Sequence, residues 1–257
     1  MKSLISINYK FMDISPKELV ELIKTSKYIK GVEACINLDS PFELKYLEDL
    51  VFELNRNDLI LQIHGEIEFD LDKQLEYIKK LEEYSDLLGY KIVLTFHTIY
   101  DEDKEISIKK TLDYISNIKS DKVIICLENL NDIRGFIRIG KDEIKNTILN
   151  DEQIYFTYDI GHELFDNGNI IGLDKYLLED IRNVHIHSNN KGNDHKPIYK
   201  NDIHWDELMK ALEFLLVNKY EYNIVFEYDL YECYGETTLD KIKDYFNSVD
   251  LISEKYM

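Results

Sequence analysis

Short apolar runs alternate with longer amphipathic segments along the whole chain. The runs are rich in β-branched residues and have the length of strands, whereas the segments between them carry apolar residues at helical spacing. We predict eight strands from this pattern: 4–8, 31–36, 59–64, 91–97, 122–128, 154–159, 184–187 and 224–227. No stretch rich in proline, glycine or serine divides the chain, so we expect one domain spanning residues 1–257.

The segments between these runs predict helices over 16–26, 41–55, 71–88, 106–118, 205–218 and 239–246. Ser15 precedes Pro16 and Ser40 precedes Pro41, an arrangement typical of an N-cap followed by proline in the first helical turn. Residues 131–150 have the least distinct pattern, and we expect some helix there.

Several of the predicted strands are apolar throughout, such as KIVLTF before His97 and IICL before Glu128. Continuous apolar runs are typical of strands buried on both faces of a parallel sheet. Eight such strands alternating with helices in 257 residues favour an α/β fold, a (β/α)8 TIM barrel. A doubly wound sheet is the alternative, but the first strand-to-helix turn, NYKFMDISP, lacks the glycine-rich sequence that a dinucleotide-binding fold needs there.

The composition argues against several classes of protein. The chain is 44% hydrophobic and 32% charged, which is ordinary for a globular domain. Its formal net charge of −19 offers little general attraction for nucleic acid. No apolar run has the length of a membrane span and the first residues lack the apolar core of a signal peptide, so we expect a cytoplasmic protein. The 3 cysteines are far apart, which argues against a disulfide framework or a thiolate zinc site.

Residues able to bind a metal stand at the ends of six consecutive predicted strands, at intervals close to one β/α unit. They are His64, His97, Glu128, Asp159, His185 with His187, and Glu227. In a (β/α)8 barrel the carboxyl ends of the strands converge on one mouth, where catalytic residues lie. A single histidine at a strand end is more commonly a hydrogen-bonded structural residue, but six such positions in series predict a shared site.

The residue types at these positions point to a metal. Glu128 and Glu227 each follow an apolar strand, where burying an unpaired carboxylate costs on the order of several kcal/mol and a bound cation offsets that cost. Imidazole with carboxylate is a ligand set for zinc, manganese, iron or cobalt, of which we expect zinc or manganese. His162 follows Asp159 by about one helical turn, and Gly161 leaves room between them, so both can face one cavity.

Two further segments add candidates to the same mouth. His185 and His187 lie two residues apart, so both belong to one face of their strand. One of them can bind the metal while the other serves as its neighbour, and the pattern leaves open which. The loop 189–197 then brings Asn193, Asp194 and His195 back beyond the seventh strand.

Taken together, these motifs resemble the xylose isomerase-like TIM barrels. In chain order they read IH at 63–64, TFHT at 95–98, LENL at 127–130, YDIGH at 158–162, HIH at 185–187, DHKP at 194–197, IHW at 203–205 and FE at 226–227. Glu33 on the second strand also matches a position of the family. Each motif is weak alone, but their order and spacing are specific. The superfamily holds sugar and sugar-phosphate isomerases and epimerases, inosose dehydratases and endonuclease IV.

The resemblance implies two different sets of metal ligands. The family's epimerases hold one divalent ion, here through Glu128, Asp159, His185 or His187, and Glu227. Endonuclease IV-like members hold three zinc ions and also use the histidines that match His64, His97, His162 and His195. The chain departs from the endonuclease pattern in the long loop. There Asn193-Asp194-His195 replaces aspartate-x-histidine, so the carboxylate is either displaced by one position or absent.

Two enzymatic hypotheses follow. The first is an isomerase or epimerase that acts on a small sugar, sugar phosphate or related polyol with one ion. Glu128 and Glu227 then transfer protons and His162 contacts the substrate. The second is an endonuclease IV-like phosphoester hydrolase with two or three zinc ions, which the acidic composition disfavours for a nucleic-acid substrate. A barrel that only binds a ligand is a third, less favoured class, and the oligomeric state stays open. We also expect substrate contacts from His187, Asn193, Asp194, Lys191, Trp205 and Glu33.

Overall fold

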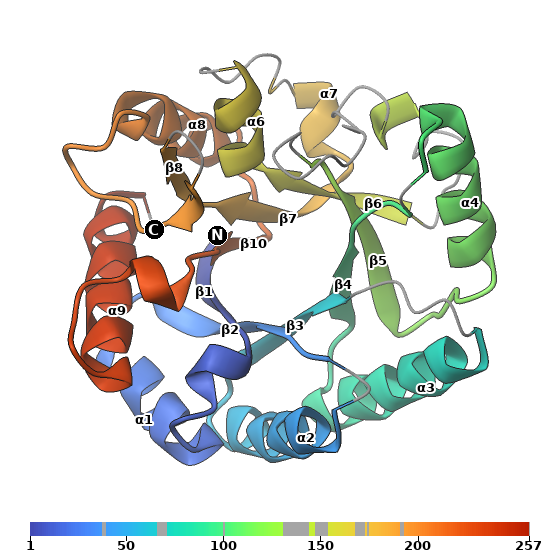
Figure 1. The fold of residues 1–257 in the computed structure, drawn as a ribbon, viewed down its shortest axis with the longest axis horizontal. Helices are drawn as coiled ribbons and strands as arrows, with labels where there is room; N and C mark the ends of the chain where they lie inside the picture. The colour runs from blue at the N-terminus through green and yellow to red at the C-terminus, as the bar shows by residue number, and fades with distance from the viewer. Residues whose placement is uncertain are drawn as a thin grey trace.

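The computed structural model describes residues 1–37, 40–65, 71–99, 101–130, 144–146, 154–167, 173, 175–190 and 193–256. Within this part of the chain, eight parallel strands form a closed barrel in the order β1-β10-β7-β6-β5-β4-β3-β2 (Figure 1). The strands are β1 (Lys2–Ile7), β2 (Ile29–Cys35), β3 (Ile60–Gly65), β4 (Ile92–Phe96), β5 (Val123–Glu128), β6 (Ile154–Asp159), β7 (Ile181–Ile186) and β10 (Asn223–Phe226). This is the predicted single-domain (β/α)8 TIM barrel.

Helices surround the barrel as an outer ring (Figure 1). They are α1 (Pro16–Thr25), α2 (Pro41–Arg56), α3 (Leu71–Leu88), α4 (Lys104–Ser116), α6 (Ile160–Asn167), α7 (Lys175–Leu178), α8 (Trp205–Val217) and α9 (Thr238–Tyr256), with short 3-10 turns at Tyr9–Phe11 and Leu230–Glu232. None of the helices described is both long and apolar enough to cross a membrane.

The proline-led helix starts form as predicted. The Ser15 side chain accepts a hydrogen bond from the backbone N–H of Glu18, and the Glu18 carboxylate accepts one from the backbone N–H of Ser15. Ser40 likewise accepts from the backbone N–H of Glu43. Each cap satisfies amide groups that the first turn of a helix leaves without partners, so these two serines fix where α1 and α2 begin.

The differences from the predicted elements have local causes. The strand predicted over 184–187 in fact begins at Ile181. The sequence pattern placed its start too late because Arg182 and Asn183 are polar and interrupt the apolar run, although Asn183 is fully buried. The helix predicted over 239–246 continues to Tyr256, since Val249 and Ile252 extend its buried face. Helix α6 was missed because it follows β6 without any spacer. The helix expected within 131–150 falls, apart from residues 144–146, outside the described residues.

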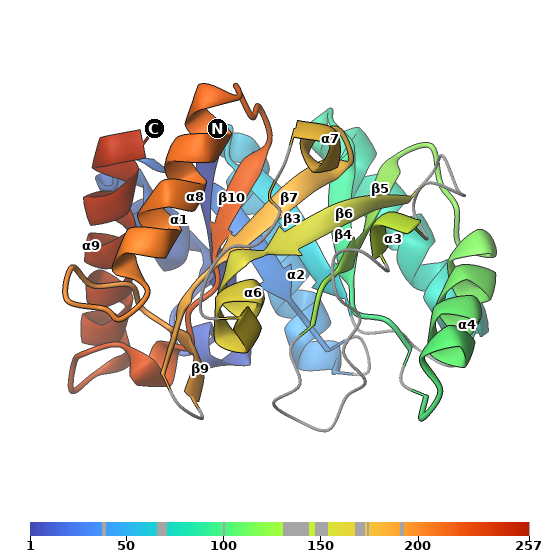
Figure 2. The same ribbon diagram turned by 90° about the horizontal axis from the view of Figure 1, so that it is seen from above.

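A hairpin that the sequence pattern did not predict follows β7. It pairs β8 (Ser188–Asn190) with β9 (Asn193–Lys196) in antiparallel fashion. In the side view of Figure 2, β9 and α6 lie toward the same end of the barrel. This is the end at which the strands finish, so the hairpin adds side chains to the mouth.

The barrel interior contains a polar layer as well as the expected apolar one. Glu33, Gln62, Thr95, Thr157 and Asn183 come from five different strands, and each is at most 1% exposed. The Thr95 and Thr157 hydroxyls lie 2.8 Å apart, and Asn183 Nδ2 donates to Glu33 Oε2 at 2.8 Å. Branched apolar side chains usually fill a TIM barrel, so a layer of this kind needs a specific reason.

The first and last strands are joined by a buried hydroxyl from α9. Tyr245 Oη accepts hydrogen bonds from the backbone N–H groups of Ser6 and Tyr228, at 3.1 and 3.2 Å, and donates to the carbonyl of Phe226. Tyr245 is fully buried. It therefore holds β1 against the end of β10, directly before Glu227.

We predict that Tyr245→Phe lowers the free energy of unfolding by about 1–3 kcal/mol, because two buried N–H groups lose their acceptor. Urea denaturation of the wild type and the variant measures the change. Tyr234→Phe is the control, since Tyr234 is 71% exposed and its replacement should have little effect. Equal effects of the two substitutions would contradict this role for Tyr245.

Candidate metal centre

The ends of the strands bring the predicted metal-binding residues together at the mouth of the barrel. His64 lies near the end of β3, Glu128 and Asp159 are the last residues of β5 and β6, and His185 lies in β7. His97 and Glu227 follow β4 and β10 directly, and His187 follows β7. The strand register contributes to this convergence, since Asp159 of β6 pairs with His185 of β7.

Glu128 is at the centre of this group. Its Oε2 lies 2.9 Å from His64 Nε2 and 3.2 Å from His97 Nε2. Its Oε1 lies 3.3 Å from His185 Nδ1 and 3.5 Å from His162 Nδ1. The carboxylate is fully buried, so four imidazoles replace the water that an exposed carboxylate would have.

Four of these residues form a compact set of donor atoms, named here the four-ligand group: Glu128, Asp159, His185 and Glu227. One donor atom from each lies within 4.8 Å of all the others. His185 Nδ1 is 2.9 Å from Glu227 Oε2 and 3.9 Å from Asp159 Oδ2. A second set, His64, Glu128 and His185, meets the same distance limit and shares Glu128 and His185 with the first.

The segment from Asp159 to His162 is shaped for this site. Asp159 Oδ1 accepts a hydrogen bond from the backbone N–H of His162 at 2.7 Å, which begins α6 immediately after β6. Asn129 holds the backbone of Asp159 from both sides, accepting from its N–H at 2.8 Å and donating to its carbonyl at 2.9 Å. A Cβ on Gly161 would lie 2.3 Å from His187, so only glycine leaves room for that ring.

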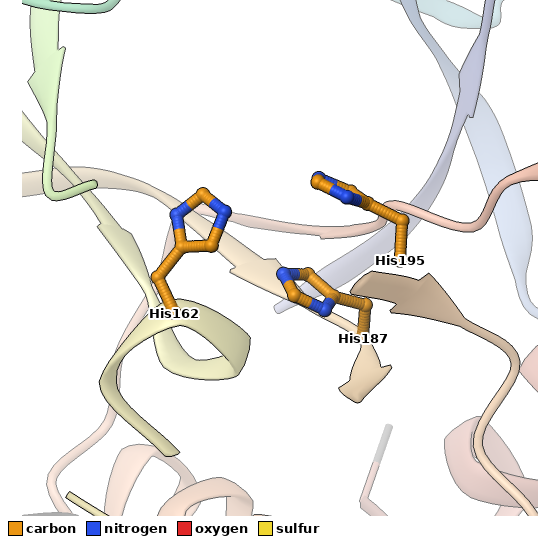
Figure 3. A group of neighbouring side chains, drawn as sticks. All are labelled: His162, His187 and His195. Carbon is orange, nitrogen blue, oxygen red and sulfur yellow. The ribbon is translucent and has the colours of Figure 1, made fainter. Parts of the chain in front are cut away.

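Three imidazoles form the three-histidine group: His162 from α6, His187 after β7 and His195 from β9 (Figure 3). The rings of His187 and His195 stack at 4.4 Å, and that of His162 lies edge-on to both (Figure 3). Asp194 lies among them, 3.3 Å from His187 and 3.6 Å from both His162 and His195. The loop carboxylate is therefore displaced by one position and still present.

The hairpin delivers His195 to the site. His195 has a positive φ of 55°, and its carbonyl accepts a hydrogen bond from the N–H of Asp229 at 2.6 Å, which ties β9 to the segment after β10. His195 Nε2 then lies 3.4 Å from Glu227 Oε1. Asn193 is the first residue of β9, and Lys191 lies outside the described residues.

The charges of the site keep its groups ionised despite burial. Burial alone would raise the pKa of Glu128 and Glu227, but the neighbouring histidines hold both well below their usual range. Burial would likewise lower the pKa of His64 and His187. Glu128 instead raises the pKa of His64 to about 9, and Asp159 raises that of His187 to about 9. Carboxylates and imidazoles thus neutralise one another in the metal-free protein.

The remaining candidates lie at different depths. Glu33 is fully buried beneath the four-ligand group, with its Oε1 2.9 Å from His185 Nε2, which favours a supporting role over contact with a substrate. Trp205 begins α8 and packs partly buried against the core.

Two asparagines that we did not predict also support the site: Asn129 holds the backbone of Asp159, and Asn183 holds the carboxylate of Glu33. Asn183 lies two residues before His185, so the alternation that places His185 and His187 on one face of the strand also places Asn183 there and could have identified it as a candidate.

The donor set fits a divalent transition metal. Buried carboxylates and imidazoles within one ion's reach match the mixed oxygen and nitrogen ligands of zinc or manganese, whereas magnesium or calcium prefers oxygen alone. The contact of Glu227 Oε2 with His185 Nδ1, at 2.9 Å, lacks hydrogen-bond geometry, so this buried oxygen has no hydrogen-bond partner among the described residues. The fold and this site together define a TIM barrel with a group of side chains at its mouth that could hold a metal ion.

The comparisons with known proteins agree with this class. The family model of the xylose isomerase-like TIM barrel matches residues 14–244, and the chain belongs to this family. No curated protein sequence matches the chain.

Solved structures share the fold over nearly the whole chain. D-psicose 3-epimerase from Clostridium cellulolyticum H10 is 14% identical with a TM-score of 0.69, covering 99% of each chain. L-ribulose 3-epimerase is 13% identical with a TM-score of 0.69, covering 99% of this chain and 95% of its own. Endonuclease IV from Thermus thermophilus is 15% identical with a TM-score of 0.62, covering 98% of this chain and 100% of its own.

We predict that the affinity for zinc or manganese rises with pH up to about pH 9. Only neutral imidazole binds a metal, and Glu33 and Glu128 hold the pKa of His185 well above its usual value in the metal-free protein. His64 and His187 contact the carboxylates of the four-ligand group and have a pKa of about 9, so a cation bound by those carboxylates also displaces their protons. A metal must displace these protons, so binding strengthens as the pH rises toward that value. Competition with a chromophoric chelator calibrated at each pH measures the dissociation constant, and a constant value between about pH 6.5 and 9 would contradict this charge assignment.

Proposed function

We propose that the protein is a metal-dependent isomerase or epimerase acting on a small sugar, sugar phosphate or related polyol. The observation that carries this proposal is the four-ligand group, in which two carboxylates flank His185 at the mouth of the barrel. The structural neighbours named above are enzymes, and two of them are sugar epimerases. The fold alone does not define the substrate, so the argument rests on the site.

Glu128, Asp159, His185 and Glu227 would hold the divalent ion. When bound, such an ion polarises a carbonyl and a neighbouring hydroxyl and stabilises the negative charge of an enediolate. His64 and His97 support Glu128 through Oε2, whereas His185 faces Oε1. This support keeps the carboxylate oriented toward the mouth.

The two glutamates divide the proton transfers. Glu128 comes from β5 and Glu227 follows β10, with β6 and β7 between them in the barrel, so the two carboxylates approach the mouth from different sides. One takes the proton from the carbon next to the carbonyl, and the other returns a proton to the opposite face. His162, which is 4% exposed and lies beside Asp159, would donate a hydrogen bond to a substrate oxygen.

The rim would provide the contacts that select the substrate. Asp194 and His187 lie beside His162. We propose that they contact the sugar hydroxyls or a phosphate, together with Asn193 of β9, Trp205 of α8 and Lys191. The substrate is a small molecule in this proposal, because the net charge of −19 is unfavourable for nucleic acid.

We predict that the purified, metal-loaded protein exchanges solvent deuterium into at least one member of a panel of keto-sugars, and that Glu128→Gln lowers the exchange rate by about 10²- to 10⁴-fold. The variant keeps the shape of the side chain but removes the charge that accepts the proton. Proton NMR of the sugars measures exchange. Glu221→Gln is the control, since Glu221 is exposed at the opposite end of the barrel, before β10. Absence of exchange across ketohexoses, ketopentoses and their phosphates would contradict the proposal.

A multi-zinc phosphoester hydrolase is the second candidate. The observations that favour it are the contacts of His64 and His97 with Glu128, and the separate three-histidine group. Both provide ligands beyond those that a single ion uses.

The number of metal ions per chain separates the two candidates. We predict one ion per chain by elemental analysis after dialysis, as an epimerase needs. Three ions per chain, together with hydrolysis of a phosphodiester substrate, would instead establish the hydrolase.

A further inference from the structure

The polar layer beneath the mouth contains a carboxylate that is buried too deeply to contact a substrate. Glu33 belongs to β2, and its side chain is 0% exposed. Its Oε2 accepts a hydrogen bond from Asn183 Nδ2 at 2.8 Å, and its Oε1 lies 2.9 Å from His185 Nε2. Glu33 therefore contacts His185 on the side opposite to the other members of the four-ligand group.

His185 uses its two ring nitrogens in opposite directions. Nδ1 faces Glu128 and Glu227 at 3.3 and 2.9 Å, whereas Nε2 faces Glu33 and Asn183. A neutral imidazole has one N–H and one lone pair, so the partner of Nε2 decides whether Nδ1 is free to bind a cation.

Counting donors favours a proton on Nε2 of His185. Asn183 Nδ2 has two hydrogens and three neighbours: Glu33 Oε2 at 2.8 Å, His185 Nε2 at 3.0 Å and Thr95 Oγ1 at 3.3 Å. Glu33 Oε1 has no hydrogen-bond partner among the described residues, and a buried carboxylate oxygen without a donor is costly. His185 Nε2, at 2.9 Å, is close enough to supply that donor. If His185 donates from Nε2 to Oε1 and Asn183 donates to Glu33 Oε2 and Thr95, both carboxylate oxygens of Glu33 have a donor and both hydrogens of Asn183 Nδ2 are used.

We propose that Glu33 is a positioning residue that holds the Nε2 proton of His185 and so directs the Nδ1 lone pair into the four-ligand group. A carboxylate behind a ligating histidine fixes the ring's tautomer and orientation and increases its basicity. The inference rests on the proposed metal site and adds a residue that controls its strength. It also explains why a charged side chain is retained inside a barrel that otherwise favours apolar residues.

The test compares three proteins: the wild type, Glu33→Gln and Gln62→Leu. Gln62 pairs with Glu33 in the register of β2 and β3, is 1% exposed, and its side-chain amide has no hydrogen-bond partner among the described residues. Gln62→Leu therefore alters the same layer without touching His185. Chelator competition gives the dissociation constant for manganese and zinc, and the visible spectrum of the Co²⁺-loaded protein reports the ligand field.

We expect Glu33→Gln to weaken metal binding by about 10- to 100-fold and to shift the Co²⁺ absorption bands. Gln62→Leu should leave both unchanged. The thermal unfolding of the metal-free variants serves as the folding control. If Glu33→Gln does not fold, Glu33→Asp replaces it, because the shorter side chain keeps the charge but no longer reaches Nε2 and should weaken binding in the same direction.

The outcomes distinguish this inference from the function on which it rests. Wild-type affinity and an unchanged Co²⁺ spectrum in Glu33→Gln would overturn the role of Glu33 and leave the metal site intact. A wild-type protein that binds neither metal would overturn the proposed function, and the inference with it. Equal losses in Glu33→Gln and Gln62→Leu would assign the effect to packing and overturn the positioning role.

Discussion

The buried carboxylate of Glu128 is the constraint on which the rest of the site depends. It stands at the end of an apolar strand with no exposed surface, and four imidazoles surround its two oxygens. A buried carboxylate is tolerated only when positive charge or hydrogen-bond donors compensate for the lost water. The histidines of β3, of β7, and of the segments after β4 and β6 provide this compensation, and all of them depend on the closed barrel to reach Glu128.

The barrel achieves this convergence through strand register and through local hydrogen bonds at the strand ends. Neighbouring strands pair so that Asp159 lies beside His185, and Asn129 fixes the backbone of Asp159. Gly161 leaves space for His187, and the β8–β9 hairpin returns His195 to the same mouth. The result is two adjoining groups of candidate ligands that differ in composition. One is rich in carboxylates and suits proton transfer, and the other is rich in imidazoles.

The sequence predicted the barrel and the convergence of the candidate residues on its mouth, because both have strong local signals. Apolar runs that end in histidine or carboxylate are conspicuous, and their repetition at regular intervals pointed to one mouth. The pairings between ligands lie beyond the sequence, because His64 and Glu128 meet only through three-dimensional register. The hairpin and α6 gave weak signals, since both are short and follow a strand almost directly.

The polar layer shows a different limit of sequence reasoning. Glu33 matched a position of the family, but its depth and its contact with His185 follow from the curvature of the closed barrel. Asn183 interrupts an apolar strand, which from the sequence suggests a strand end and in the structure marks the support beneath the ligands. The proposed metal ligands and the residues beneath them thus form two adjoining layers, in which the lower one supports the upper.

The most direct test of this account is the position of a bound ion in a crystal of the manganese-loaded protein, located by anomalous diffraction. The account predicts a peak bounded by Glu128, Asp159, His185 and Glu227, with His185 binding through Nδ1. A peak elsewhere, or ligation of His185 through Nε2, would contradict it.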